Sequence, residues 1–185
     1  MLFRSIPGTE EYISCDTLML SVGLIPENEL STRCGVVLDP ATGGPSVSED
    51  MQTSVSGVFA CGNVVHVHDL VDYVTEESLR AGIGAANYIQ GTAQKDGHIQ
   101  TNPGTGVRYV VPQRISAGRT EPVQLFFRVT EVMRKAVIRV MAGGKEIKTL
   151  RRPYAAPGEM ETVTIDPALL GGTGSVLEVE ATANE

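Results

Sequence analysis

Hydrophobic and polar residues follow two different patterns along the 185-residue chain, and the pattern changes after about residue 106. In the first part, apolar residues stand in short, nearly unbroken runs such as "DTLMLSVG" at residues 16–23. Such a run is typical of a strand that is covered on both faces within a parallel sheet. In the second part, apolar and polar residues alternate over short segments, which is typical of strands with one buried face.

The first part of the chain predicts further short strands. "GVVLD" and "GPSVS" flank a turn at residues 39–45 that is rich in Pro and Gly. "GVFACGN", residues 57–63, predicts another buried strand. These strands, together with residues 16–23, indicate part of an α/β domain with a parallel sheet.

One helix is predicted from about Thr75 to Gln90. Thr75 or Asp72 can cap it, Gly91 can end it, and Glu77 in the first turn is expected to complement the helix dipole. The positions expected to contact a sheet or another backbone are Leu79, Gly82, Ile83, Ala86, Tyr88 and Ile89.

The second part of the chain predicts an all-β, sandwich-like domain. Six strand-like runs with turns between them follow residue 106, and no helix is expected beyond a short turn near residues 167–170. The polar stretch 92–106, which contains Gly and Pro, is interpreted as a linker. We therefore expect a partial α/β domain at 1–91, a linker at 92–106 and an antiparallel β-sandwich at 107–185.

Composition excludes some classes of function. Apolar residues make up 42% and charged residues 20% of the chain, as in globular proteins, and the net charge of −7 argues against a nucleic-acid surface. No apolar run reaches the length of a membrane span, and the first residues lack the apolar middle of a signal peptide, so we expect a cytoplasmic protein. Cys15, Cys34 and Cys61 form no C-x-x-C pair and are expected to be buried, inert thiols.

A partial domain needs the remainder of its sheet. A parallel strand at residues 16–23 requires neighbouring strands and crossover helices, and the chain encodes neither. We therefore expect that this chain is the C-terminal part of a longer protein, whose N-terminal part is its first partner.

The segment around Gly62 and Asn63 has features of a flavin dinucleotide site. Glycine at the end of a strand lets a ligand approach the backbone, and the Asn63 amide can bond a ribityl hydroxyl. Free N–H groups at the helix start, at Tyr73, Val74 and Thr75, would face a pyrimidine carbonyl. These five residues are the predicted cofactor-binding set around one cleft. The alternative is an ordinary turn at the end of a strand, because Asn and Gly are common turn formers.

The same residues resemble a known family. Thr53, residues 57–60 and Gly62-Asn63 resemble the second FAD motif of the pyridine nucleotide-disulfide oxidoreductases, which include thioredoxin reductase-like proteins. "TLMLSVGLIPENEL" resembles the segment that returns to the FAD domain, and "ESLRAGIGAANYI" resembles the helix under the flavin. The resemblance covers about residues 12–91. It implies a Rossmann-like fold, FAD as cofactor and NAD(P)H as co-substrate of the intact parent.

The chain also departs from the family pattern. Asn63 replaces the usual aspartate, and the chain contains neither the two G-x-G-x-x-G fingerprints nor a redox cysteine pair. We therefore expect the isolated chain to be inactive and to bind FAD weakly or not at all, with its catalytic residues unknown. The alternative function is a non-catalytic β-sandwich that mediates assembly or docks a partner subunit.

The "HVHD" sequence raises the possibility of a metal site. His66 and His68 would share one face of an extended segment, and Asp69 or Asp72 would have to complete the ligand set. Zinc sites need three or four ligands, and this set is poor. We therefore predict no metal and interpret both histidines as loop residues, with a position beside the substrate or the flavin as the alternative.

Overall fold

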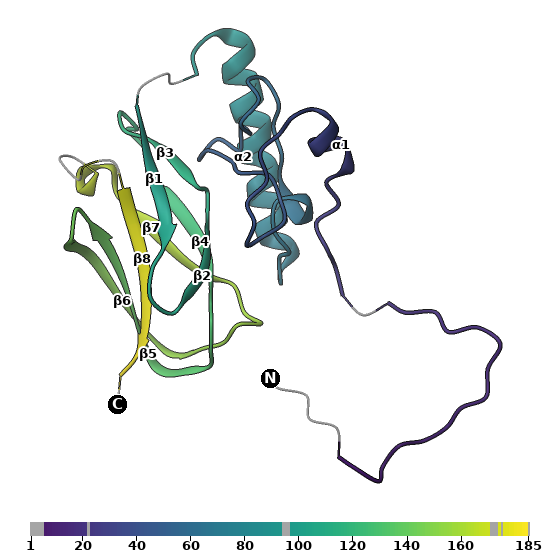
Figure 1. The fold of residues 1–185 in the computed structure, drawn as a ribbon. Coiled ribbons are helices and arrows are strands. Elements are labelled where there is room, and N and C mark those ends of the chain that lie inside the picture. The colour runs from purple at the N-terminus through teal and green to yellow at the C-terminus, as the bar shows by residue number, and fades with distance from the viewer. Residues whose placement is uncertain (1–5, 22, 94–96, 171–173, 175, 185) are drawn as a thin grey trace.

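The computed structural model describes residues 6–21, 23–93, 97–170, 174 and 176–184, and it is mostly β with few helices (Figure 1). Two α-helices are present in this part, α1 (Glu29–Arg33) and α2 (Val71–Gln90). Two 3₁₀ turns, η1 (Gly62–Val64) and η2 (Pro167–Leu169), complete the helical structure, and η2 lies where the sequence predicted a short turn.

The strands form two sheets. One sheet has five strands in the order β3-β1-β8-β5-β6, and the other has three strands in the order β2-β4-β7. The strands are β1 (His98–Pro103), β2 (Val107–Val111), β3 (Arg114–Ser116), β4 (Val123–Val129), β5 (Met133–Ala142), β6 (Lys145–Ala155), β7 (Glu161–Ile165) and β8 (Val176–Ala183).

Strand β1 corrects two predictions. It lies inside the stretch 92–106 that was interpreted as a linker, and it pairs in parallel with β8, so the five-stranded sheet is mixed and not antiparallel. Ile99 and Thr101 of β1 are buried and alternate with exposed neighbours. Because Ile99 is the only aliphatic side chain of "HIQTNP" outside proline, hydrophobic alternation gave no signal for this strand. The division of the chain into two domains stays a prediction.

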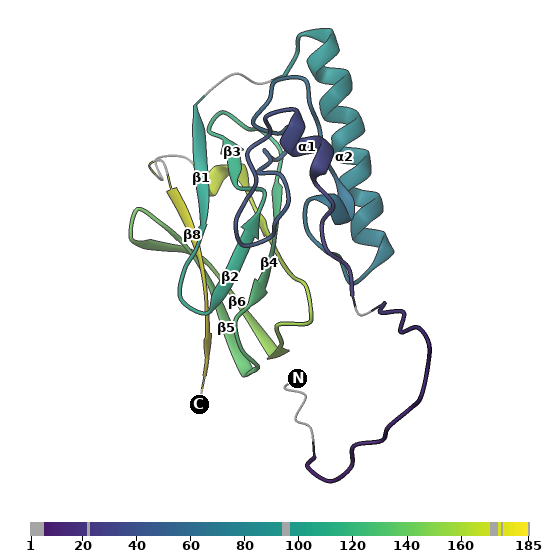
Figure 2. The ribbon, with the colours of Figure 1, turned by 45° about the vertical axis from the view of Figure 1, so that its right-hand side comes forward.

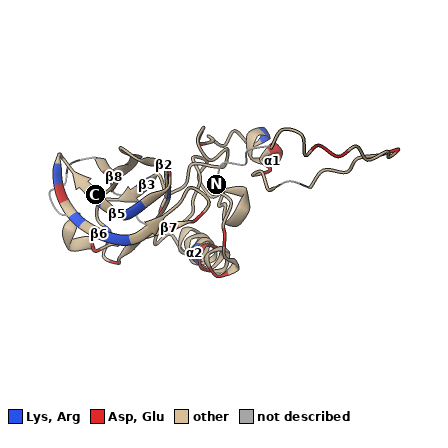
Figure 3. Ribbon diagram, turned by 90° about the horizontal axis from the view of Figure 1, so that it is seen from below, with Lys and Arg blue, Asp and Glu red and all other residues tan. Residues whose placement is uncertain are grey.

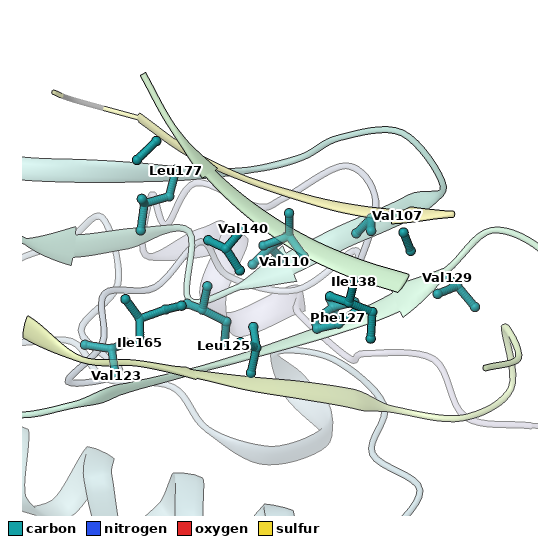
Figure 4. Packing of buried hydrophobic residues seen from close by; sticks show 14 of the residues in the cluster. Val107, Val110, Val123, Leu125, Phe127, Val129, Ile138, Val140, Ile165 and Leu177 are labelled. Carbon is teal, nitrogen blue, oxygen red and sulfur yellow. The ribbon is translucent and has the colours of Figure 1, made fainter. Parts of the chain in front are cut away.

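A hydrophobic cluster between the two sheets forms the larger core (Figure 4). The three-stranded sheet contributes Leu125 and Phe127 of β4, and the five-stranded sheet contributes Ile138 and Val140 of β5, all with no exposed surface. Burying each such side chain is worth about 1.5–3 kcal/mol relative to leaving it in water. This core joins the two sheets, and β2 of the three-stranded sheet also packs against the N-terminal half of the chain.

Strand β6 lies at one edge of the five-stranded sheet and carries many charges. In Figure 3 the ribbon of β6 is coloured blue in several places, where its basic residues lie. The charged residues of the strand include Lys145, Glu146, Lys148, Arg151 and Arg152. Charged side chains, lysine above all, disfavour the pairing of an exposed edge with another strand.

The N-terminal half does not form the predicted sheet. Residues 6–21 extend away from the rest of the molecule (Figures 1 and 2). Residues 23–26 also contain no strand, so the strand predicted at 16–23 is not formed, and Val22 lies outside the described residues. Elsewhere among the described residues before 97, only isolated β-bridges appear: Leu38 with Pro45, Gln52 with Phe59, and Ser48 with Arg114 of β3. A strand obtains its backbone hydrogen bonds from neighbouring strands, and the described segments offer it none.

Helix α2 begins earlier than predicted. Its first residue is Val71, and its N-cap is Leu70, which makes no side-chain cap, so neither Thr75 nor Asp72 caps it. Gly91 ends the helix in the left-handed conformation with φ 72°, as predicted.

The buried face of α2 is also not the predicted one. Glu77, Ala81 and Gly84 face inward. Leu79 and Ile83, two of the predicted contact positions, are more than 60% exposed. Gly84 allows this packing, because a Cβ at that position would lie 2.4 Å from the carbonyl oxygen of Asp50. Tyr88, another predicted contact position, packs edge-on against Phe59 with ring centroids 6.2 Å apart, whereas Leu79, Ile83 and Ile89 stay mostly exposed.

The segment between α1 and α2 lies against the sheets and connects α2 to them. Val47, Met51 and Val65 from this segment pack with Tyr109 and Val111 of β2 in a second, smaller cluster. A hydrogen bond reinforces this contact: the side-chain Oε1 of Gln113 accepts from the backbone N–H of Val47 at 2.9 Å. This packing fixes the turn that precedes α2.

The thiols are more accessible than predicted. Cys15 lies in the extended segment and Cys34 follows α1, and both are exposed, because neither position is covered by another element. Cys61 is half-buried and its Sγ lies 3.7 Å from Ser78 Oγ.

No helix among the described residues combines the length and the apolar character needed to cross a membrane.

Candidate functional site

Gly62 is the first residue of the 3₁₀ turn η1 and lies beside the first part of α2 in space. Its φ of +71° is a conformation that favours glycine, and an added Cβ would lie 3.2 Å from Val74 Cγ1. Its N–H donates to Glu77 Oε2 at 2.8 Å. The structure thus brings Gly62 and Val74 together, and Val74 occupies the space beside the glycine. The approach of a ligand to the backbone at Gly62 stays a prediction.

Asn63 lies on the surface of the same turn. Its side chain is exposed, and its Oδ1 accepts a hydrogen bond from the backbone N–H of His68 at 3.1 Å. No hydrogen bond from its Nδ2 is seen among the described residues. The amide therefore closes the loop with its oxygen and presents its N–H donors to solvent.

Tyr73 and Thr75 have different surroundings. The ring of Tyr73 packs edge-on against Phe126, with centroids 5.3 Å apart, and lies 6.3 Å from the ring of His68. Thr75 is exposed, and its Oγ1 donates to the carbonyl oxygen of Val71 at 3.1 Å.

The free N–H groups of α2 lie about one turn before Thr75. A helix leaves only its first few N–H groups without an intrahelical acceptor. Because α2 begins at Val71, these are the groups at Val71, Asp72 and Tyr73. Of the three predicted positions at the helix start, only Tyr73 falls among them.

Beneath this surface, His66, His68 and Glu77 form a fully buried polar cluster. His66 Nε2 lies 2.7 Å from Glu77 Oε1, and His68 Nε2 lies 3.0 Å from Glu77 Oε2. The two imidazole rings have centroids 4.3 Å apart. The sequence predicted Glu77 as an acid of the first helical turn that complements the helix dipole, which is wrong because α2 begins at Val71 and Glu77 is buried. The only sequence signal was a His-x-His pair just ahead of a helix, and only the fold shows which acid faces it.

Electrostatics in the cluster favour an ionised Glu77. Burial raises the pKa of its carboxyl group, but His66 and His68 beside it lower the pKa by more, to about 2. Burial lowers the pKa of His66 below its ordinary value, and the hydrogen bond to Glu77 offsets this only in part. A carboxylate that accepts from the Gly62 N–H and from a neutral His66 Nε2–H is consistent with both directions.

Asp69 points away from this cluster. Its carboxylate accepts from the Arg128 guanidinium and from the backbone N–H of Met160. Arg128 also donates to the carbonyl oxygen of Val67 at 3.0 Å, which ties β4 to the loop. The third group beside the two histidines is thus Glu77, and Asp69, named in the sequence analysis as a possible ligand, is already paired with a cation.

Comparison with known proteins gives one family match. Residues 3–86 match the family described as "Pyridine nucleotide-disulphide oxidoreductase". The chain is 30% identical over 115 residues to a dihydrolipoyl dehydrogenase of Trypanosoma brucei brucei. It is 32% identical over 119 residues both to a mitochondrial dihydrolipoyl dehydrogenase of Pisum sativum and to a leghemoglobin reductase of Glycine max. No solved structure matches the chain significantly.

The matches cover most of this chain but only a small share of each relative. They include 62–63% of this chain but only 21–23% of the relatives, so the chain spans about a fifth of the length of the curated relatives it matches. The 115 matched residues also exceed the 80 positions from 12 to 91 over which the resemblance was seen in the sequence. The similarity therefore includes residues outside that range.

Proposed function

We propose, from the match of residues 3–86 to the pyridine nucleotide-disulphide oxidoreductase family, that the chain is part of an FAD-dependent, NAD(P)H-linked oxidoreductase. The observation that carries the proposal is the family match together with relatives named dihydrolipoyl dehydrogenase and leghemoglobin reductase. Since the chain spans about a fifth of those relatives, the adenine-side and NAD(P) fingerprints would belong to a missing N-terminal part.

The exposed turn beside α2 fits the flavin end of FAD. Asn63 has N–H donors free to bond a ribityl hydroxyl. The first N–H groups of α2, at residues 71–73, place a positive helix end beside it, which suits the pyrimidine carbonyl. Gly62 would set the backbone of the turn, with Val74 behind it. FAD would supply the hydride chemistry, and these residues would bind and orient it.

Unpartnered apolar surfaces support the proposal of a longer protein. Leu18 and Leu20 of the extended segment and Leu79, Ile83 and Ile89 of α2 are all at least 62% exposed. Apolar surface of this extent marks a contact site in folded proteins. In the proposed parent, residues 16–23 would become a strand of the FAD domain and the exposed stripe of α2 would pack against that domain.

The second candidate is an assembly or docking module formed by the β-rich part. The observation in its favour is that this part has its own buried core. The charged edge strand β6 speaks against docking by strand addition. In this second proposal the β-rich part docks a partner subunit. We also propose a cytoplasmic location for the protein, although the relative from Pisum sativum is named mitochondrial.

A single substitution tests the proposed flavin contact. In the full-length protein, Asn63→Leu removes one neutral hydrogen bond, worth about 0.5–1.5 kcal/mol, so FAD affinity is expected to fall about 2- to 13-fold. The matched control is Asn184→Leu, at an exposed asparagine that follows β8. The measurement is FAD affinity by quenching of flavin fluorescence. Equal affinity in both variants would remove Asn63 from the site.

A further inference from the structure

The buried cluster of His66, His68 and Glu77 has more polar atoms than partners. Three of its four ring nitrogens, His66 Nδ1 and both nitrogens of His68, are buried without a hydrogen-bond partner. His68 Nε2 lies 3.0 Å from Glu77 Oε2, yet the pair does not have hydrogen-bond geometry. Leaving a buried polar group unsatisfied is unfavourable. Each neutral imidazole carries one N–H and one lone pair, so these nitrogens include lone pairs that a further group could bind.

The donor atoms are grouped closely enough for one ion to reach all of them. One donor atom from each of the three residues lies within 4.8 Å of the other two. In a tetrahedral zinc site with bonds of about 2.0–2.2 Å, ligand atoms stand about 3.3–3.5 Å apart. His66 Nε2 lies 2.7 Å from Glu77 Oε1 and His68 Nε2 lies 3.0 Å from Glu77 Oε2, slightly below this spacing. An ion held by these atoms would open both pairs and displace the proton from His66 Nε2 to Nδ1.

The chemistry of the three donors selects the class of ion. Two imidazoles and one carboxylate suit zinc and neighbouring first-row metals, whereas Mg²⁺ and Ca²⁺ prefer oxygen ligands. Arg128, whose charge acts on His66, is already paired with Asp69. We propose that His66, His68 and Glu77 bind one divalent transition-metal ion, for which Zn²⁺ is the probe.

A fourth ligand has a route to the site. A cavity of about 240 Å³ opens beside His66 and is lined also by Tyr109, Arg108 and Arg128. It is large enough for several waters, one of which would complete the coordination. The ion would hold the loop 66–68 against α2, and through the Gly62–Glu77 bond it would stabilise the turn that carries Asn63. This site is separate from the proposed flavin contact, and neither requires the other.

The test measures zinc uptake by the purified chain. After chelation and dialysis against Zn²⁺, wild type is expected to bind one ion per chain. Glu77→Gln and His68→Gln are each expected to weaken binding about 100-fold or more, since even residues that only support metal ligands contribute 10- to 100-fold. The matched control is His98→Gln, at the exposed third histidine of the chain, which should bind as wild type.

Two readouts separate loss of the site from loss of the fold. Far-ultraviolet circular dichroism reports whether each variant is folded. For wild type, Co²⁺ in place of Zn²⁺ should give the visible bands of a tetrahedral site without a thiolate charge-transfer band, which decides the matter even if a variant fails to fold. No uptake by folded wild type, unchanged uptake in folded Glu77→Gln and His68→Gln, loss of uptake in His98→Gln, or a thiolate band from a cysteine would each overturn the proposal.

Discussion

Two glycines of helix α2, Gly82 and Gly84, stand two residues apart in different environments, and their replacement by alanine should have opposite effects. Gly82 is exposed, and nothing lies within 4 Å of an added Cβ. Gly84 is buried, and its added Cβ would lie 2.4 Å from the carbonyl oxygen of Asp50 and 3.1 Å from Phe59 Cε1. The pair therefore tests how α2 packs on the rest of the chain.

The expected magnitudes follow from these contacts. Gly82→Ala gains helix propensity alone, about 0.5–1 kcal/mol of stability. Gly84→Ala has the same gain but forces backbone atoms apart, which costs about 1–3 kcal/mol. Since the propensity terms cancel, the two variants should differ by about 1–3 kcal/mol in the free energy of unfolding.

Urea unfolding followed by circular dichroism measures this difference. With an m-value of about 2 kcal/mol/M, the midpoint of Gly82→Ala should lie about 0.5–1.5 M above that of Gly84→Ala. Wild type should fall between them or close to Gly84→Ala. If both variants gain the same stability, Gly84 is not in contact with Asp50 and the described packing of α2 is wrong.

Two further outcomes concern the core and the extended segment. Phe127→Ala in the core between the sheets should lower the free energy of unfolding by about 3–5 kcal/mol. Val132→Ala, at a half-exposed surface position, should change it by no more than about 0.5 kcal/mol. Equal losses of stability in urea unfolding would contradict the assigned core. Brief chymotrypsin treatment should cut first after Tyr12, Leu18 or Leu20 in the exposed segment, and mass spectrometry that instead finds the first cut between residues 98 and 170 would refute this order.

The sequence predicted those elements whose own residues carry the signal. Strands such as β4 and β5 were predicted because "VQLFFRV" and "KAVIRVMA" hold β-branched and aromatic residues within short, turn-bounded runs. Gly91 was correctly predicted to end α2 because a left-handed cap favours glycine. The interpretation of residues 92–106 as a linker fails at residues 98–103, because β1 is hydrogen-bonded to β3 and β8 there.

The elements that could not be predicted depend on partners distant in sequence. The apolar stripe of α2 suggested the wrong inward face, because the face packed in this chain carries Ala81, Gly84 and Glu77 instead. In the same way, no local pattern could show that Glu77 would meet His66 and His68, since they are brought together only when α2 folds back over the loop. Of the predicted site, the proximity of Gly62 to Val74 is seen, and the flavin contacts of Asn63, Tyr73 and Thr75 remain predictions.

The most direct test of the central proposal is the ratio of flavin to protein in the native protein, captured from cells with an antibody raised against residues 1–185. We expect a polypeptide several times longer than this chain, since the chain spans about a fifth of its relatives, with one FAD per polypeptide in its absorbance spectrum. The purified chain alone, holding only the flavin end of the site, should bind FAD weakly or not at all. A captured protein of this chain's own length, with no flavin absorbance, would contradict the account.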